Sequence, residues 1–488
     1  MYHDKISAHD TQRIIKENNI MNMQEATSIM KADSYKMAAL SEDTRNNILA
    51  HVKDALIAHK DEIFAANAKD MAAAEENGIA ASVKKRLKFD EHKLDDVTNG
   101  IDELIKLPDP VGQIQLKREL DDGLVLQRVS CPIGVIGIIF EARPDALVQI
   151  SSLCIKSGNC AVLKGGKETA NTNKALFDVI YSTAVANGAP EGCMLQASQH
   201  NEIDELLSCN KSVDLLIPRG SNAFVQYIMN NTKIPVMGHA DGICHTYIDK
   251  DADIEKAIPI IIDAKTQYTA ACNATETLLI HKDVADEMLP AIAKALMEHG
   301  VKLRGTADAA RIINRAECNI NHHEESTKAN TADSNSAAIN EKSNLGKSNS
   351  SADNQTSCEI MGDNDFNTEY LDMILSVKIV DDVQDAISHI NHFGSHHTDC
   401  IVTENADTAA LFMQLVDSAG VYQNCSTRFA DGFRYGFGAE VGISTSKIHA
   451  RGPVGLEGLV TYKYKLYGHG QIVDDYATGK KHFHFRDL

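Results

Sequence analysis

Cys272 is the residue in this chain whose position is best suited to chemistry. It lies in the segment 270–280, where a polar loop leads into an apolar strand, so its thiol has no obvious packing partner. A nucleophilic cysteine needs its thiolate form, some exposure, and nearby cations or amide dipoles that lower its pKa. Free cysteine otherwise behaves as a small buried hydrophobic residue. The local sequence leaves both interpretations open.

Two glycine turns could hold phosphate groups. The turns Lys164-Gly-Gly-Lys167 and Gly220-Ser221 each follow a short apolar run and precede a helix-length segment. Such a turn lets backbone N–H groups and a helix N-terminus approach a phosphate closely. Neither a GxGxxG nor a Walker A sequence is present, so each turn alone is equally consistent with a tight turn carrying solvated lysines. Two such turns in one sheet favour a dinucleotide.

The elements that must position these turns form the pattern of a parallel α/β sheet. Four short apolar runs are separated by helix-length segments: Gly134–Phe140, Cys160–Leu163, Asp214–Ile217 and His245–Ile248. Ligands of such sheets bind at the carboxyl ends of the strands. The residues that follow the first three runs are rich in glycine, cations or both, which predicts a ligand site there.

A second α/β section begins near Asp251. It contains the Cys272 loop, an apolar strand at 277–280, a helix around 284–298 and a strand at 399–402. The chain is therefore predicted to be an α/β protein with a Rossmann-type cofactor domain and a separate α/β catalytic domain.

A polar segment interrupts this second section. Residues 321–357 hold eight serines and seven asparagines, with Ile339 and Leu345 as the large apolar residues. Such a stretch cannot bury enough surface to become ordered, so we expect a disordered insertion over 315–360. Its His322-His323 pair is expected to be solvated, and no metal site is predicted.

Two segments have the pattern of strands that pair outside the main sheets. Residues 113–131 suit a hairpin whose turn uses Asp122-Gly123, and residues 459–466 alternate like a half-exposed edge strand. Both predict a small β-flap and a homo-oligomer.

These patterns divide the chain into four parts. We expect a disordered extension over 1–25, a cofactor-binding domain over 26–250 and a catalytic domain over 251–440. Residues 441–488 are expected to return to the cofactor domain and to end in the oligomerisation strand and tail.

Composition excludes several classes of protein. The formal net charge of −20 argues against a nucleic-acid partner, which normally requires a basic face. Eleven cysteines without CxxC pairs indicate neither a disulfide framework nor a zinc ribbon. The start carries no apolar signal region and no run approaches a membrane span, so we expect a cytoplasmic protein without membrane contact.

Several blocks, in order, resemble the aldehyde dehydrogenase superfamily and, within it, the gamma-glutamyl phosphate reductases or glutamate-5-semialdehyde dehydrogenases. The resemblance covers roughly residues 30–488 except the insertion. Its blocks are Gly134–Asp145, Leu215–Ser221, Ala271–Leu279, Val383–Ile390, Ser426–Phe429, Gly438–Thr445 and His449–Pro453.

The resemblance implies roles for particular residues. Cys272 takes the position of the nucleophile, and Lys164 that of the lysine at the adenosine ribose. Lys167 stands where many NAD-using relatives carry a carboxylate, so NADPH is favoured over NADH as cofactor. The two residues of the second turn, Gly220 and Ser221, would bind the same cofactor, and Glu369 matches the glutamate at the nicotinamide ribose.

Two departures from the wider superfamily are informative. Hydrolytic members carry a glutamate that activates water, and this chain has His239-Ala-Asp241-Gly instead, although His239 or Asp241 could serve as a base. Arg143 stands where relatives place an asparagine that stabilises the oxyanion. Its guanidinium could serve the oxyanion or hold the leaving phosphate.

The resemblance implies NADPH-dependent reduction of L-glutamyl 5-phosphate to L-glutamate 5-semialdehyde and phosphate through a Cys272 thioester. This is the reductive step of proline biosynthesis from glutamate. Arg428, Arg219 and Arg451 are candidate partners for the substrate anions, with Arg428 the first choice.

Two alternatives remain open at this point. One is a dehydrogenase that passes its acyl group to coenzyme A. The other is a non-catalytic partner of glutamate 5-kinase. A transient contact with that kinase is also compatible with the reduction of L-glutamyl 5-phosphate.

Overall fold

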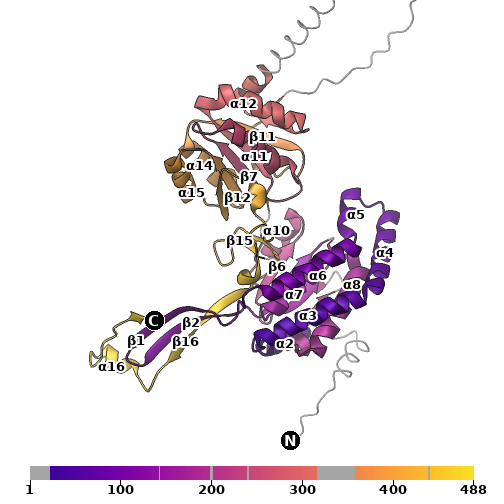
Figure 1. The fold of residues 1–488 in the computed structure, drawn as a ribbon, viewed down its shortest axis with the longest axis vertical. Coiled ribbons are helices and arrows are strands. Elements are labelled where there is room, and N and C mark those ends of the chain that lie inside the picture. The colour runs from indigo at the N-terminus through magenta and orange to yellow at the C-terminus, as the bar shows by residue number, and fades with distance from the viewer. Residues whose placement is uncertain (1–21, 142, 198–201, 239–240, 316–357, 438–439) are drawn as a thin grey trace, which may run out of the picture. The chain divides into compact units, whose positions relative to one another are not determined.

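The computed structural model describes residues 22–141, 143–197, 202–238, 241–315, 358–437 and 440–488. The chain divides into two compact units, one of Met1–Ala240 with Asp431–Leu488 and one of Asp241–Ala430 (Figure 1). The predicted extension at the N-terminus and the predicted insertion lie largely outside the described residues. In the described residues, no helix is long and apolar enough to cross a membrane.

The first unit is built on a parallel four-stranded sheet of order β5-β4-β3-β6. Its strands are β3 (Val135–Phe140), β4 (Cys160–Lys164), β5 (Met194–Ala197) and β6 (Leu215–Arg219). Every residue of β3 and β4 is buried, as expected for strands covered on both faces. The predicted parallel α/β sheet is confirmed for the runs Gly134–Phe140, Cys160–Leu163 and Asp214–Ile217. Strand β5 is an additional strand that the sequence analysis did not predict.

Helices form further layers around this sheet, some preceding its first strand in sequence and others each following one of its strands. They are α2 (Met23–Met37), α3 (Glu42–Ala58), α4 (Lys60–Glu76), α5 (Ala81–Leu87), α6 (Glu91–Lys106), α7 (Pro144–Lys156), α8 (Ala170–Ala186), α9 (Glu202–Leu207) and α10 (Asn222–Asn231), with short turns η1 (Lys167–Thr169) and η2 (Glu191–Cys193). Helix α2 begins inside the stretch expected to be an extension. Its Met23, Met30 and Met37 recur every seven residues and are buried, and Asn22 caps its first turn.

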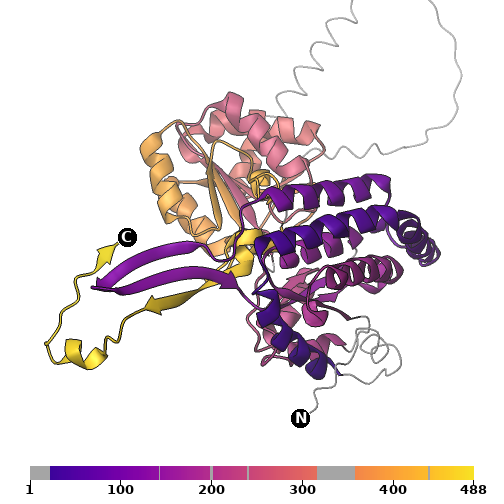
Figure 2. The same cartoon turned by 60° about the horizontal axis from the view of Figure 1, so that its bottom comes forward.

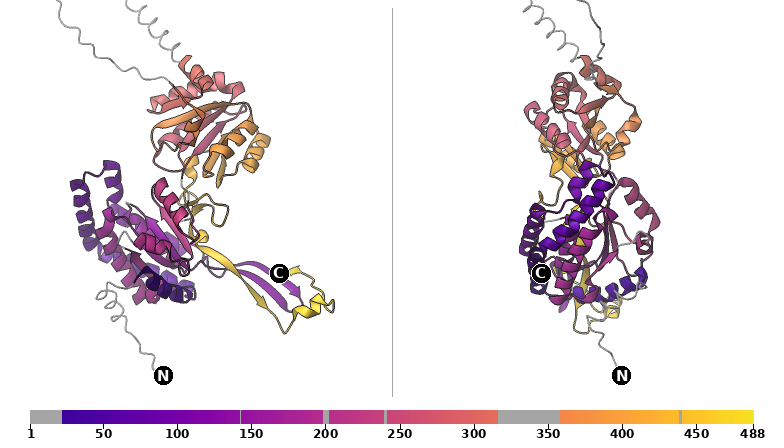
Figure 3. Two further views of the ribbon diagram at one scale, coloured as in Figure 1. Left: turned by 180° about the vertical axis from the view of Figure 1, so that it is seen from behind. Right: turned by 90° about the vertical axis from the view of Figure 1, so that its right-hand side faces the viewer.

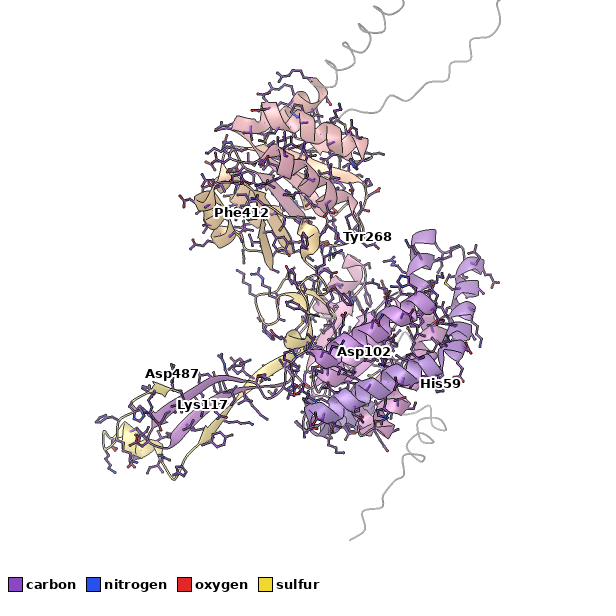
Figure 4. All side chains as sticks on the ribbon, viewed as in Figure 1. His59, Asp102, Lys117, Tyr268, Phe412 and Asp487 are labelled. Carbon is purple, nitrogen blue, oxygen red and sulfur yellow. The ribbon has the colours of Figure 1, made fainter. Side chains whose placement is uncertain are left out.

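A separate antiparallel sheet of order β16-β2-β1-β17 forms the flap of the first unit (Figure 2). Its strands are β1 (Ile114–Asp121), β2 (Leu124–Pro132), β16 (Val460–Tyr467) and β17 (Arg486–Asp487). Gly123 turns the hairpin with φ +70°, a conformation that favours glycine. Figure 4 labels Lys117 on β1 and Asp487 on β17, the strand that the C-terminal tail adds to the hairpin. The predicted hairpin and edge strand are thus confirmed.

Smaller elements complete the first unit. They are β14 (Gly442–Ser444), β15 (Gly452–Val454), η5 (Leu456–Leu459) and α16 (Val473–Ala477).

The second unit is built on a parallel seven-stranded sheet of order β10-β9-β11-β8-β7-β12-β13. Its strands are β7 (Cys244–Ile248), β8 (Thr275–His281), β9 (Lys302–Gly305), β10 (Glu359–Ile360), β11 (Ile374–Val380), β12 (Thr398–Val402) and β13 (Gly420–Gln423). The run His245–Ile248, expected in the first sheet, therefore belongs to the second. An apolar run marks a buried strand without identifying its partners, because pairing depends on the fold of the whole chain.

Helices cover both faces of this second sheet. Helices α11 (Ile254–Thr266) and α12 (Lys282–Glu298) pack on one face, and α14 (Val383–Phe393) and α15 (Ala406–Leu415) on the other (Figure 3). The short turns η3 (Asp363–Asn367) and η4 (Thr427–Phe429) lie in its loops. The units meet in sequence at 240/241 and 430/431, whereas the sequence analysis placed these boundaries at 250/251 and 440/441.

A buried ion pair lies inside the second unit. Lys265 Nζ on α11 is 2.6 Å from Glu276 Oε2 on β8, and the two side chains are 0% and 1% exposed. Burial raises the pKa of Glu276 to about 7, and Lys265 opposes that rise. Burial also lowers the pKa of Lys265. Desolvation is thus the largest influence on the pKa of both groups, and the charge of each partner offsets part of the cost of burying the other.

We predict that Lys265→Met destabilises the protein by about 3–5 kcal/mol, because it leaves a buried carboxyl without its partner. The folded-state pKa of Glu276 lies above its unfolded value, so protonated Glu276 contributes stability at low pH that is lost as the pH rises through the folded-state pKa. In Lys265→Met the ionised carboxylate has no partner to offset its burial. The loss should therefore be larger at about pH 8 than at about pH 5. Urea unfolding followed by circular dichroism measures both values.

Lys282→Met is the matched control, because it breaks an ion pair with Asp381 in which both side chains are more than half exposed. It should cost less than about 1 kcal/mol. The double variant Lys265→Met/Glu276→Leu should recover most of the lost stability. Equal losses for Lys265→Met at the two pH values would contradict this account of the pair.

Candidate active site

The loops that enter three neighbouring strands meet at one edge of the second sheet. Strands β8 and β12 flank β7, and all three are parallel. Their amino ends therefore lie together, which collects the residues that precede them: Gly242 before β7, Cys272 before β8 and His397 before β12. Residues 125 positions apart in sequence come into contact there.

Cys272 is held in a tight loop at this edge. Ala274 N–H donates to the Ala271 carbonyl at 2.9 Å, and buried Asn273 donates its Nδ2 to the Ala430 carbonyl at 2.8 Å. A Cβ added at Gly242 would lie 2.1 Å from the carbonyl oxygen of Cys272 and 2.4 Å from its Cα. The two loops therefore touch backbone to backbone, and position 242 accepts only glycine without displacing Cys272.

The exposure of Cys272 distinguishes it from most of the other described thiols. Cys154 and Cys400 are fully buried, and burial raises the pKa of each to about 12. Such thiols remain protonated at neutral pH and cannot act as nucleophiles. Cys272 is half-buried, as are Cys131 and Cys425. The contact with a histidine separates Cys272 from these two.

That histidine is His397, which the sequence analysis missed. Its Nε2 lies 3.2 Å from Cys272 Sγ, and its Nδ1 lies 2.9 Å from Thr398 Oγ1. The side chain of His397 is buried, with 1% exposed. The only signal in the sequence was a histidine shortly before the strand 399–402. That position becomes informative only when β12 is known to be separated from β8 by the single strand β7.

Two other candidate residues belong to the same unit as Cys272. Arg428 is 8% exposed, donates its Nε to Gln267 Oε1 at 2.9 Å, and lies 6.0 Å from the ring centre of Tyr268, which Figure 4 labels. Its neighbour Thr427 bonds to Thr275 at the start of β8. This guanidinium is therefore fixed to the segment that leads into the Cys272 loop.

Glu369 precedes β11, the neighbour of β8 on its other side. Its carboxylate is among the groups that raise the pKa of Glu276, after burial, and Leu371 N–H donates to Glu276 Oε1 at 3.2 Å. The carboxylate of Glu369 is therefore close enough to Glu276 to act on it electrostatically. Of the two residues that could replace a hydrolytic base, Asp241 is half-buried beside Gly242, and His239 lies outside the described residues.

The two glycine turns lie together at the carboxyl edge of the first sheet, after β4 and β6. Lys164 ends β4 and donates its Nζ to the Gly165 carbonyl at 2.8 Å. Burial lowers the pKa of Lys164, and the carboxylates of Glu202 and Glu168 oppose this. Lys167 is exposed at the start of η1.

The first unit fits a dinucleotide at this edge. A Cβ at Gly165 would lie 2.1 Å from Nδ2 of Asn173, which is buried and bonded to Thr169. A Cβ at Gly220 would lie 2.9 Å from Phe224. Ser221 is the N-cap residue of α10. Close protein neighbours thus require glycine at both turns, and the second turn leads directly into a helix N-terminus, which suits the approach of a pyrophosphate.

Arg143 and Arg219 line one cleft of the first unit, about 460 Å³ in volume. The cleft also contains Glu440, whose Oε1 lies 4.0 Å from Arg219 and whose Oε2 accepts the Gly432 N–H at 2.9 Å. Burial raises the pKa of Glu440, and Arg219 opposes this. Arg451 lies elsewhere in the same unit, in a cavity of about 920 Å³ that Arg128 of the flap also lines.

The structure therefore brings Arg143 and Arg219 together and separates both from Arg451.

The chain is similar to known proteins over nearly its whole length. Residues 7–452 match the aldehyde dehydrogenase family. It is 50% identical to gamma-glutamyl phosphate reductase of Acetivibrio thermocellus over 463 residues, 95% of this chain and 97% of that protein. It is 52% identical to gamma-glutamyl phosphate reductase 1 of Synechocystis sp. over 455 residues, 93% of this chain and 95% of that protein.

A solved structure agrees with these relatives. The crystal structure of gamma-glutamyl phosphate reductase from Thermotoga maritima matches with a TM-score of 0.81 and 33% identity, covering 93% of this chain and 100% of that chain. The fold predicted from the resemblance is thereby confirmed. The chain belongs to the aldehyde dehydrogenase family, in the group of the gamma-glutamyl phosphate reductases.

Proposed function

We propose that this chain reduces L-glutamyl 5-phosphate to L-glutamate 5-semialdehyde and phosphate, the reductive step of proline biosynthesis from glutamate. The observation that carries the proposal is the half-buried Cys272, held against Gly242 in a fixed loop, in a chain about half identical to gamma-glutamyl phosphate reductases. A thiol in that setting suits covalent catalysis.

The Cys272 thiolate attacks the acyl carbon of the substrate, and backbone N–H groups of its loop stabilise the oxyanion of the tetrahedral intermediate. Phosphate leaves and Cys272 holds the acyl group as a thioester. A reduced nicotinamide cofactor, when bound, supplies the hydride. Collapse of the resulting hemithioacetal releases the aldehyde and the thiolate of Cys272.

A second part of the proposal concerns the residues that would bind the cofactor. Lys164, Gly220 and Ser221 would hold the cofactor at the carboxyl edge of the first sheet, and Glu369 would hold its nicotinamide ribose. Lys167 carries an exposed cation that suits a 2′-phosphate, which supports NADPH as the cofactor.

The substrate carries a carboxylate and a phosphate, and arginines are suited to both. Arg428 is our first candidate, because its guanidinium is buried and fixed by Gln267. Arg143 and Arg219 share a cleft and are the next candidates, followed by Arg451.

We predict that the enzyme, assayed with the semialdehyde, reduces NADP only when phosphate is present and uses NADP in preference to NAD. Cys272→Ala should lose this activity by at least about 1,000-fold, because it removes the thiol that forms the thioester. Absorbance of the reduced cofactor gives the rates. Cys131→Ala, at another half-buried cysteine, is the control and should retain turnover.

Each part of this assay can contradict the proposal. Activity with coenzyme A in place of phosphate would indicate an acylating dehydrogenase. Full turnover by Cys272→Ala would show that the nucleophile is wrong, and absence of turnover in the wild type would favour a non-catalytic role.

A second prediction concerns the position of the nucleophile. Gly242→Ala places a Cβ within 2.4 Å of the Cys272 backbone, so the Cys272 loop must move. A displacement of about 1 Å at a reacting atom can lower the rate about 100-fold. We expect a loss of that order in kcat, measured in the same assay.

Gly362→Ala is the control for this variant, because a Cβ there meets no heavy atom within 4 Å. It should leave kcat unchanged. Wild-type turnover by Gly242→Ala would show that the Cys272 loop tolerates the displacement.

We also propose that the chain forms a homo-oligomer through the free edge of β16. Among the described strands β16 pairs only with β2, and Tyr462, Tyr464 and Leu466 on it are each about half exposed. An exposed apolar edge strand is a template for pairing with another chain.

We predict that Tyr464→Glu shifts the protein toward the monomer, measured as molar mass by light scattering during gel filtration. A charge at a paired edge must lose its hydration, which weakens association. Tyr35→Glu on α2, where the tyrosine is 69% exposed against 59% for Tyr464, is the control and should not change the mass. A monomeric wild type, or an unchanged mass for Tyr464→Glu, would contradict the proposal.

A further inference from the structure

The contact between His397 and Cys272 points to a role that the proposed function does not contain. His397 Nε2 lies 3.2 Å from Cys272 Sγ, which is hydrogen-bonding distance for a sulfur donor. Two other buried histidines of this unit are explained by protein contacts: His245 Nδ1 bonds to Asp399 Oδ1 at 3.0 Å, and His389 packs against Phe366 and Phe393. His397 instead faces the one half-buried thiol in this loop.

The orientation of the His397 ring is set from its other nitrogen. Nδ1 lies 2.9 Å from Thr398 Oγ1, whose hydroxyl oxygen can accept an Nδ1–H. A neutral imidazole carries its proton on one nitrogen, and in the tautomer in which Nδ1 donates to Thr398 the lone pair of Nε2 faces Cys272 Sγ. That is the tautomer a base for the thiol requires.

The backbone around His397 is fixed on two sides. The His397 carbonyl accepts the Gly420 N–H at 3.0 Å, which attaches it to β13. Ser395 exchanges hydrogen bonds with Ile243, the residue after Gly242, at 2.9 Å and 3.3 Å. The His397 loop and the Cys272 loop are therefore both attached to the segment that enters β7.

Other titratable groups lie around this pair. Behind it, Cys244 on β7 donates its Sγ to the Cys272 carbonyl at 3.3 Å, and Asp399 on β12 accepts from His245 and Ser418. His396 Nδ1 bonds to the Asp417 carbonyl. The ion pair of Lys265 with Glu276 on β8, the Arg428 guanidinium and Asp241 beside Gly242 are further charged groups of this unit. Asp399 thus serves His245 and Ser418, whereas His397 is a proton acceptor in contact with Sγ.

We propose that His397 is a catalytic base for Cys272 and that Thr398 is its positioning residue. Nε2 takes the proton from Sγ, which leaves a thiolate beside an imidazolium. The inference rests on the proposed function for its substrate, but activation of the thiol needs no substrate and can be tested alone.

The proton balance closes over one turnover. The thiolate forms the C–S bond as the bond from carbon to the phosphate oxygen breaks, and the imidazolium proton passes to the departing phosphate. After hydride addition, collapse of the hemithioacetal returns the electron pair to Sγ. One proton from solvent then restores the pair, so the net reaction consumes one proton.

The test measures alkylation of Cys272 by iodoacetamide as a function of pH in the full-length protein without substrate. Modification is read by mass spectrometry of the peptide that contains Cys272. In the wild type the rate should stay high well below the pKa of an ordinary thiol, about 8.5. In His397→Gln it should follow that ordinary pKa, so that the rate at about pH 6.5 falls about 10- to 100-fold.

His396→Asn is the matched control. His396 is adjacent to His397, but its Nδ1 faces a backbone carbonyl, and asparagine tolerates its φ of +60°. Its alkylation profile should coincide with that of the wild type. A profile of His397→Gln that coincides with the wild type would overturn the proposal, because a purely structural histidine would not set the pH dependence of the thiol.

A second measurement covers the case in which His397→Gln does not fold. The ultraviolet absorbance of the thiolate, taken as wild type minus Cys272→Ala, is titrated in the full-length protein. Thiolate that persists well below about pH 8 supports the pair, and titration at the ordinary thiol pKa of about 8.5 overturns it. Neither measurement requires turnover, so failure of the proposed reaction would be seen separately.

Discussion

The candidate active site depends on one constraint, the backbone contact between Gly242 and Cys272. A Cβ at position 242 would lie 2.1 Å from the Cys272 carbonyl oxygen, so the loops entering β7 and β8 are packed without room for a side chain. Through Ser395 and Ile243 the loop entering β12 is attached to the same segment. The position of Sγ relative to His397 follows from this packing, because three parallel neighbouring strands hold the three loops at one edge.

Buried polar pairs behind this edge keep the strands in place. The ion pair of Lys265 with Glu276 joins α11 to β8, and Asp399 on β12 accepts from both the backbone and the ring of His245 on β7. Such groups cost desolvation energy that only a matched partner offsets, so they disfavour alternative strand arrangements. A site whose atoms must meet within a few tenths of an ångström benefits from that rigidity.

The candidate sites of the two sheets lie at opposite ends of their strands. In the first unit the glycine turns lie at the carboxyl ends of the strands, where bare backbone and helix N-termini suit phosphate groups. In the second unit Cys272 and His397 lie at the amino ends of theirs. A thiol with a neighbouring base needs a fixed loop and a proton acceptor rather than a helix dipole, so the rule that locates phosphate sites did not locate this pair.

The sequence by itself determined the class of fold, the strands that carry the turns, and Cys272 as the nucleophile candidate. Apolar runs, glycine turns and ordered blocks are local signals, and they survive without knowledge of the partners of each strand. Only the tertiary structure moved His245–Ile248 into the second sheet, separated Arg451 from Arg143 and Arg219, and revealed His397 beside Cys272. These facts depend on which strands become neighbours, and strand order is decided by the packing of the whole chain.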